Sequence, residues 1–315
     1  MTEVLDVLRI FGGFVYLLLG GDFLVRGALG LSRESSIPPV VVGLTVVAMG
    51  TSAPELMVSA FSALSGFPGI AIGNVVGSNI ANVLLVIGVP VLIHSISCTE
   101  ETLPKQTGLM IGVTLLFMVM CYLTPLGVID GIILLVILAS FLTMTVRGAA
   151  VMPLDDAEDE LERVLGLPGE KWSIALLVIL GMITLPLGAN LAVEGAAGLA
   201  KSWGVTEAVI GLSIIALGTS LPELSTTVIA ALHKSSDVAL GNVVGSNLFN
   251  ILLIMGFTSV LTEVPVEAHI LRFDIWVMFL ASVVLWMFVL ARGTIGKRMG
   301  VIFLASYGAY IFAIY

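Results

Sequence analysis

The chain has 315 residues, of which 58% are hydrophobic and only 11% charged, and its formal net charge is −9. A soluble domain carries about 25% charged residues, so this composition indicates a polytopic membrane protein without a sizeable soluble domain. The acidic balance and the lack of a basic patch argue against nucleic acid as a partner.

Apolar windows predict ten membrane-spanning helices. A single long polar connection, residues 147–171, separates the fifth from the sixth and contains the acidic run from Asp155 to Glu160. We therefore expect an all-α protein with two five-helix halves, residues 1–146 and 172–315, joined by this acidic loop. The predicted spans are 8–30, 38–64, 70–94, 105–124, 126–146, 172–198, 206–232, 238–262, 271–291 and 295–315.

The two halves are copies of each other at one constant separation along the chain, which we call the repeat offset. This offset takes Gly20 to Gly188 and holds without a gap as far as Gly88 and Gly256, and the heptapeptide 73–79 recurs unchanged at 241–247. Because each half has an odd number of spans, we expect the second copy to insert upside down relative to the first. Inverted repeats are typical of secondary transporters, whose binding site lies at the repeat interface near the bilayer midplane.

Positive charge predicts the orientation of the chain in the membrane. Most lysines and arginines fall in the loops on one side, whereas the other side, both termini included, has only Arg9, Lys201 and Arg272. Both termini are therefore expected outside, and the 147–171 loop is expected in the cytoplasm. The protein is predicted to reside in a prokaryotic-type plasma (inner) membrane.

One short motif occurs once in each half, as Gly-Thr-Ser-Ala-Pro-Glu at 50–55 and Gly-Thr-Ser-Leu-Pro-Glu at 218–223. Each copy ends in a glutamate, Glu55 or Glu223, near the middle of a long apolar segment. A charge at that depth costs about 2.5–3.5 kcal/mol on insertion scales, so its occurrence in both halves indicates function. The proline before each glutamate should break the helix and free the glycine carbonyl four residues back.

A purely structural interpretation of the same motif is that Ser-x-x-Glu forms a capping box at a restarted helix. Ser52 with Glu55, and Ser220 with Glu223, have the required spacing. Capping does not need a carboxylate at the costliest depth of the membrane, and the two interpretations are compatible.

The third and eighth spans supply polar partners. Serine and asparagine four residues apart share a helix face in both copies, with one further asparagine a turn earlier. The asparagine next to each serine, Asn79 or Asn247, is angled away from that face and is expected to hydrogen-bond between helices. Paired glycines spaced by four residues should allow close helix approach. The residues on the polar face are Ser78, Asn82 and Asn74 in the first half, and Ser246, Asn250 and Asn242 in the second.

These groups form a set of oxygen atoms without histidine or cysteine, which suits Ca²⁺ and Na⁺. Two buried carboxylates repel each other and resist desolvation. One divalent ion, two monovalent ions or two protons would neutralise both. We therefore expect the protein to change between inward and outward states only when its site is loaded. Elsewhere, Asp22 and Arg26 are expected to form a local ion pair near a helix end.

The paired motifs resemble the two α-repeats of the calcium/cation antiporter superfamily, and in particular prokaryotic Na⁺/Ca²⁺ exchangers. The resemblance covers nearly the whole chain. It implies that the first and sixth spans slide past the other helices, and that backbone carbonyls near Ala48 and Ala216 help to bind Na⁺. The ligand set that it implies is Glu55, Glu223, Thr51, Ser52, Thr219, Ser220, Ser78, Ser246, Asn82 and Asn250.

The pattern departs from some relatives, including K⁺-dependent exchangers, which have aspartate where this chain has Asn250. With two formal charges in the site, K⁺ cotransport is not expected. The favoured function is Na⁺-driven Ca²⁺ antiport, with H⁺/Ca²⁺ exchange as the alternative. An enzyme is not predicted, because His-Glu-x-x-His is absent and a dyad-like pair alone gives no reason for hydrolysis. A channel would normally take its glutamate ring from an oligomer. No cofactor and no obligate protein partner are expected beyond the lipid bilayer.

Overall fold

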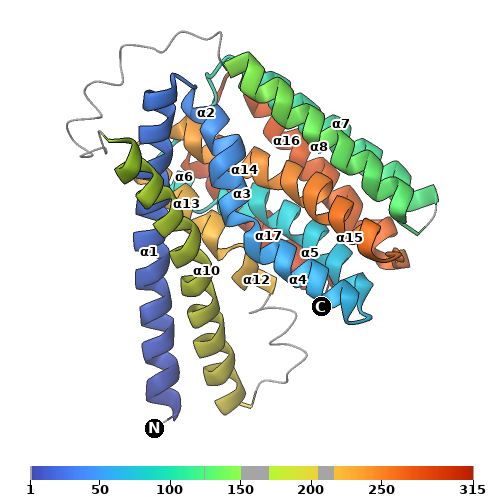
Figure 1. Cartoon of the computed structure of the whole chain (residues 1–315). Helices are drawn as coiled ribbons and strands as arrows, with labels where there is room; N and C mark the ends of the chain where they lie inside the picture. Colours follow the sequence, from blue (N-terminus) through green and yellow to red (C-terminus); the bar gives the residue numbers. More distant parts are fainter. Residues whose placement is uncertain (1, 124, 150–169, 205–215, 315) are drawn as a thin grey trace.

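The computed structural model describes residues 2–123, 125–149, 170–204 and 216–314, and these are almost entirely helical (Figure 1). The first half contains α1 (Thr2–Ser35), α2 (Pro39–Val42), η1 (Gly43–Val47), α3 (Ala48–Thr51), α4 (Ala53–Leu64), α5 (Pro68–Ala81), η2 (Asn82–Val86), α6 (Pro90–Ile93), α7 (Leu103–Leu123) and α8 (Val128–Ala149), where η denotes a π-helix. The second half contains α10 (Lys171–Ser202), α12 (Ala216–Thr219), α13 (Leu221–Leu232), α14 (Ser236–Phe249), η4 (Asn250–Met255), α15 (Gly256–Leu261), η5 (Ile270–Asp274), α16 (Ile275–Leu290) and α17 (Lys297–Ile314).

These elements account for nine of the ten predicted spans. Eight continuous helices are long and apolar enough to cross a membrane, and the pair Pro39–Thr51 and Ala53–Leu64, bent by 45°, makes a ninth. The remaining span, 206–232, is described only over α12 and α13, and the acidic run 155–160 lies outside the described residues. The part of the chain that the structure describes is therefore a polytopic helical membrane protein.

Helices α1 and α10 are longer than the predicted spans and lie side by side at one edge of the molecule (Figure 1). With 34 and 32 residues, they extend about 50 Å, well beyond the roughly 30 Å hydrocarbon core. They run antiparallel at backbone contact. A Cβ added to Gly13 would lie 2.5 Å from the Ala192 nitrogen, and one added to Gly181 would lie 2.8 Å from the Leu24 nitrogen.

The glycines of this interface recur at every seventh position in both helices and are related by the repeat offset. Side chains at any of them would meet the opposite helix at 2.5–2.8 Å, so small residues set the helix separation. The two sets are Gly13, Gly20 and Gly27 in α1, and Gly181, Gly188 and Gly195 in α10.

The core of the molecule is built from the third and eighth predicted spans. Within the span windows, the segment Ser236–Leu261 is 94% buried and Pro68–Ile93 is 72% buried, against 11–44% for the other continuous spans. Close approach to α14 depends on glycine, because a Cβ on Gly241 or Gly245 would lie 2.5 Å from the carbonyl oxygen of Val40 or Leu44. The counterparts of those contacts for the glycines at 73 and 77 would involve residues 208–212, which are not described.

The expected helix break occurs within the glutamate motif of each half. Ser52 has φ −81° and ψ 4°, and Ser220 has φ −85° and ψ 3°, so both leave helical geometry at the same point. The helices restart immediately, since the nitrogens of Leu56 and Leu224 donate to the carbonyl oxygens of these two serines. Proline at the beginning of α4 and α13 is compatible with a restarted helix, where the missing N–H would have no intrahelical partner.

Turns and short strands show the same internal correspondence. Gly66 and Lys234, which the repeat offset relates, have φ of +89° and +57°, and Ser36 and Gly204, related in the same way, have φ of +52° and +82°. The structure also adds a feature that an all-α prediction lacks: β1 (Ile96–Ser97) pairs antiparallel with β2 (Thr294–Ile295). An isolated bridge joins Leu126 to Val264, at nearly the corresponding positions of the other copy.

The adjacent glycines of α1 allow a matched test of the helix contact. Gly13→Ala should destabilise the protein by about 1–3 kcal/mol, because the new methyl group overlaps α10 backbone. Gly12→Ala, which meets nothing within 4 Å, should leave stability unchanged or slightly raised. Thermal unfolding of the purified protein in detergent measures both. Equal melting temperatures for the two variants would contradict the interface.

Candidate cation site

The two motif glutamates lie inside the helix bundle. Glu55 is 1% exposed and Glu223 is fully buried. The break in the first motif brings its hydroxyls toward the second half: Ser52 Oγ donates to Glu223 Oε1 at 3.2 Å. Within the described part of the chain, neither glutamate forms a salt bridge with lysine or arginine. The site thus holds two acidic side chains without a cationic partner.

Thr51 makes a second connection between the halves. Its hydroxyl lies 3.2 Å from Asn242 Oδ1 and 3.4 Å from Ser246 Oγ, both in α14. The same hydroxyl is 3.2 Å from the carbonyl oxygen of Ala48, which also accepts from the Ser52 nitrogen. Thr51, Ser52, Ala48 and Ser246 therefore come together as one cluster of oxygens beside the helix break.

An asparagine in each half fixes the backbone that carries the glutamate. Asn74 Nδ2 donates to the Glu55 carbonyl oxygen at 3.3 Å and to Ser59 Oγ at 3.0 Å. Asn242 Nδ2 makes the corresponding bonds, to the Glu223 carbonyl oxygen at 3.4 Å and to Thr227 Oγ1 at 3.0 Å. These four bonds are related by the repeat offset, so the two half-sites are built in the same way.

Asn82 and Asn250 begin the π-helical segments η2 and η4, and both are 1% exposed. Asn82 Nδ2 donates to Asn247 Oδ1 at 3.1 Å, and Asn250 Nδ2 donates to Asn79 Oδ1 at 2.9 Å. Each amide is therefore held by an asparagine of the other half.

Five buried oxygens of the predicted ligand set have no hydrogen-bond partner among the described residues. Buried polar atoms are normally paired, and an unpaired one costs about 1–3 kcal/mol. All five are acceptor or hydroxyl oxygens, the kind of atom that Ca²⁺ and Na⁺ take as ligands. They are Glu55 Oε2, Glu223 Oε2, Asn82 Oδ1, Asn250 Oδ1 and Ser220 Oγ.

The remaining predicted residues correspond only in part. Thr219 Oγ1 donates to Asn74 Oδ1 at 3.5 Å, which is the repeat counterpart of the Thr51–Asn242 bond. Ser78 is buried, and no side-chain hydrogen bond joins it to Thr219 as Ser246 is joined to Thr51 among the described contacts. Ala216 begins α12, but its side chain falls outside the description. No group of three or more acidic, histidine or cysteine side chains gathers in the described chain, so binding here would depend on neutral oxygens.

The capping-box interpretation is wrong for both serines. Neither Ser52 nor Ser220 makes a side-chain capping bond to its helix. Ser52 instead reaches across to Glu223, because the polar side chain of the other half lies within hydrogen-bond distance.

Sequence reasoning assigned no direct role to several residues that shape the site. Ser59 and Thr227 anchor the asparagines that hold the glutamate backbone, and Asn247 is in turn contacted by Met110 Sδ of α7 at 3.7 Å. Ser59 follows Glu55 by one helical turn, and Thr227 follows Glu223 by the same distance. This shared spacing is the sequence signal that could have identified both residues. Met110 had none, because it belongs to a span outside the motifs.

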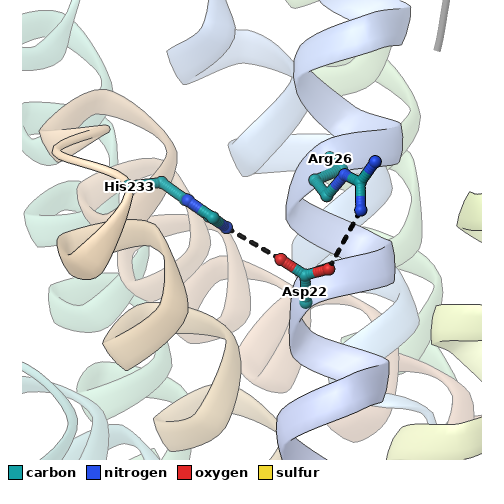
Figure 2. A network of polar contacts seen from close by, with 3 residues as sticks. All are labelled: Asp22, Arg26 and His233. Carbon is teal, nitrogen blue, oxygen red and sulfur yellow. Dashed lines mark hydrogen bonds and ion pairs between the residues drawn. The ribbon is translucent and has the colours of Figure 1, made fainter. Parts of the chain in front are cut away.

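The expected Asp22–Arg26 pair forms, with Arg26 Nη1 3.4 Å from Asp22 Oδ2, but it is not only local (Figure 2). His233, which caps the C-terminal end of α13, places Nε2 2.9 Å from Asp22 Oδ1 (Figure 2). Ser225 of the same helix donates to the Leu17 carbonyl oxygen at 2.6 Å. Helix α1 is therefore joined at two levels to the helix that carries Glu223.

Comparison with known proteins identifies the family of the chain. The family model described as sodium/calcium exchanger protein matches residues 6–147 and 173–315. The chain belongs to this family. It is 36% identical to the putative antiporter CaxA of Alkalimonas amylolytica over 96% of both chains, and 32% identical to the sodium/calcium exchanger MaX1 of Methanosarcina acetivorans, again over 96% of both.

A solved structure of the sodium-calcium exchanger NCX_Mj superposes on this exchanger-family chain with a TM-score of 0.86 at 30% identity. The superposition covers 99% of each chain. The resemblance to prokaryotic Na⁺/Ca²⁺ exchangers is thereby confirmed for both sequence and fold.

The Asp22–His233 contact should couple α1 to α13. Asp22→Ala and His233→Ala should each lower the melting temperature. The double variant should melt close to Asp22→Ala, because that substitution already removes the bond to His233, worth about 1 kcal/mol, together with the pair to Arg26. Thermal unfolding in detergent measures this. Asn190→Ala is the control, since Asn190 is the counterpart of Asp22 and, among the described residues, bonds only to Glu194 of its own helix. Additive losses would show that the two side chains are independent.

Proposed function

We propose that this protein is a secondary antiporter that exchanges Ca²⁺ for Na⁺ by alternating access, with the ions held by Glu55 and Glu223. The observation that carries the proposal is the group of five unpartnered buried oxygens, which come from both halves and include one oxygen of each glutamate. The family membership and the exchangers among the relatives point to the same substrates.

The ligand chemistry favours these two ions. Carboxylate, amide, hydroxyl and carbonyl oxygens are hard ligands in a flexible arrangement, which suits Ca²⁺ better than Mg²⁺ and also suits Na⁺. The full ligand set that we propose is Glu55, Glu223, Thr51, Ser52, Thr219, Ser220, Ser78, Ser246, Asn82 and Asn250, with the carbonyl groups near Ala48 and Ala216.

Electrostatics provides the coupling. Two carboxylates without a cationic partner are costly to bury, so the unloaded site opposes passage between the two access states. One Ca²⁺ or two Na⁺ neutralise both charges and remove that cost. Exchange, rather than leak, follows because only a loaded site crosses.

The proposed architecture is two inverted five-helix repeats, 1–146 and 172–315, with ten spans and a cytoplasmic 147–171 loop. Both termini would face outward from a prokaryotic inner membrane. Matching helix breaks at Ser52 and Ser220 support the repeat, as do the matching bonds of Asn74 and Asn242. The long α1–α10 pair is the unit that we propose slides past the rest of the bundle.

Substitution of the glutamates tests the two-carboxylate mechanism. Glu55→Gln and Glu223→Gln should each abolish Ca²⁺ exchange, at least a hundredfold, while the protein still elutes as a folded species. The amide keeps the shape but removes one of two charges, which leaves Ca²⁺ only half neutralised. Uptake of ⁴⁵Ca²⁺ into proteoliposomes is the measurement, with Glu194→Gln, an exposed glutamate of α10, as control. Normal flux in either site variant contradicts the mechanism.

The coupling ion is tested separately, because H⁺/Ca²⁺ exchange on the same fold is the alternative. An outward-directed Na⁺ gradient imposed on wild-type proteoliposomes should drive ⁴⁵Ca²⁺ uptake with the pH equal on both sides. A pH gradient alone, without Na⁺, should drive little. If only the pH gradient supports uptake, the glutamates act as proton carriers and the Na⁺ assignment is wrong.

A further inference from the structure

Four buried asparagines form a crossed set of hydrogen bonds between the two halves. Asn79 and Asn82 come from α5 and η2, and Asn247 and Asn250 from α14 and η4, and each is 1% exposed. Asn82 donates to Asn247 Oδ1, Asn250 donates to Asn79 Oδ1, and Asn79 Nδ2 donates to the Asn247 carbonyl oxygen at 3.3 Å. The two amide–amide bonds are exchanged by the repeat offset.

Within each hydrogen-bonded pair of asparagines, the side-chain oxygens of the two members differ in whether they accept a hydrogen bond. The Oδ1 atoms of Asn79 and Asn247 accept a hydrogen bond, whereas those of Asn82 and Asn250 are buried without a partner among the described residues. An asparagine amide has an acceptor edge and a donor edge on opposite sides. Once Nδ2 of Asn250 is bound to Asn79, its carbonyl oxygen has to point the other way.

We propose that Asn79 and Asn247 are positioning residues that orient the amides of Asn250 and Asn82, so that their carbonyl oxygens face the cation. The proposal rests on the proposed function, because it takes Asn82 and Asn250 as ligands. Without the acceptor of the partner asparagine, either amide can turn over and present its NH₂ group to the cation. The NH₂ group repels a cation, so the turned side chain would oppose cation binding instead of contributing an oxygen ligand.

The arrangement also explains what an amide at position 250 requires. A carboxylate has two equivalent acceptor oxygens and no donor edge, so it presents an oxygen to the cation in either orientation. An aspartate at 250 therefore needs no positioning partner, whereas Asn250 does. The dependence on Asn79 should disappear when position 250 is aspartate.

The difference between asparagine and aspartate at position 250 distinguishes a positioning role of Asn79 from a general packing role. Asn79→Ala should weaken Ca²⁺ binding about tenfold, equivalent to about 1.4 kcal/mol. In the Asn250→Asp background the same substitution should change binding less than about twofold. The second pair, Asn247→Ala with and without Asn82→Asp, repeats the comparison. Ser282→Ala is the control, since Ser282 is buried and its side chain bonds, within the described part of the chain, only to the Met278 carbonyl oxygen of its own helix.

The readout is the Ca²⁺ concentration that gives half-maximal thermal stabilisation of the purified full-length protein, which does not need transport. Equal losses with asparagine and with aspartate at 250, or no loss in either, overturn the proposal. Misfolding of Asn79→Ala that persists with aspartate at 250 also overturns the proposal, because that result would assign Asn79 a role in folding alone. Failure of the proposed function is distinguishable, since wild-type protein would then show no stabilisation by Ca²⁺.

Discussion

The structure depends on holding two acidic side chains inside a bundle of apolar helices without a basic residue to balance them. Glu55 and Glu223 are buried, and one oxygen of each has no hydrogen-bond partner in the described chain. Such an arrangement is costly in a low-dielectric interior, where charge is normally paired. Surrounding groups lessen the cost without removing it: Ser52 donates to one carboxylate, and Asn74 and Asn242 hold the backbone behind each. What remains is the uncompensated negative charge on which the proposed cation binding rests.

Several irregular segments of the backbone lie beside the polar groups of the site. Membrane-spanning helices tolerate a break or a π-helical turn only where protein or a polar cavity satisfies the freed groups. Here the helices break at Ser52 and Ser220, next to the glutamates, and the π-helical segments η2 and η4 begin at Asn82 and Asn250. Glycines bring α14 to backbone contact with the broken helix. Tight packing and local irregularity together bring polar side chains of both halves into hydrogen-bond contact.

Much of this arrangement could be predicted from the sequence because its motifs occur in both halves. A charged residue within an apolar segment is conspicuous, and its recurrence at the repeat offset predicts a shared site. Three features could not be predicted in this way. Helices α1 and α10 extend past their apolar windows, because they support each other: Asp6 lies directly over Gly198, 2.6 Å from where a Cβ would be. The short strands arise from loops far apart in sequence.

The third feature is the partner that Asn79 and Asn247 contact. The sequence predicts that these two asparagines bond between helices, and they do, but the identity of the partner depends on how the helices cross. On a single helix, Asn79 is angled away from the face of Asn82, so helix geometry alone assigns it no part in the site. Across the interface, it meets Asn250 of the opposite half, at a distance that helix periodicity does not give. Periodicity identifies which residues share a face of one helix. It does not identify the residues that a neighbouring helix brings against the other face.

The halves correspond closely at the site and differ where α1 and α10 contact the bundle. Helix α1 bonds to α13 through Leu17 with Ser225 and through Asp22 with His233. The counterparts of Ser225 and His233 in the first half are Met57 and Ser65, both exposed, and no hydrogen bond joins α10 to α4 in the described chain. Under the alternating access that we propose, a site built by two related halves would serve both sides of the membrane equally, and the two access states would differ in contacts outside it. The α1–α13 bonds differ between the halves in this way, since the described residues of α10 and α4 have no counterpart of them.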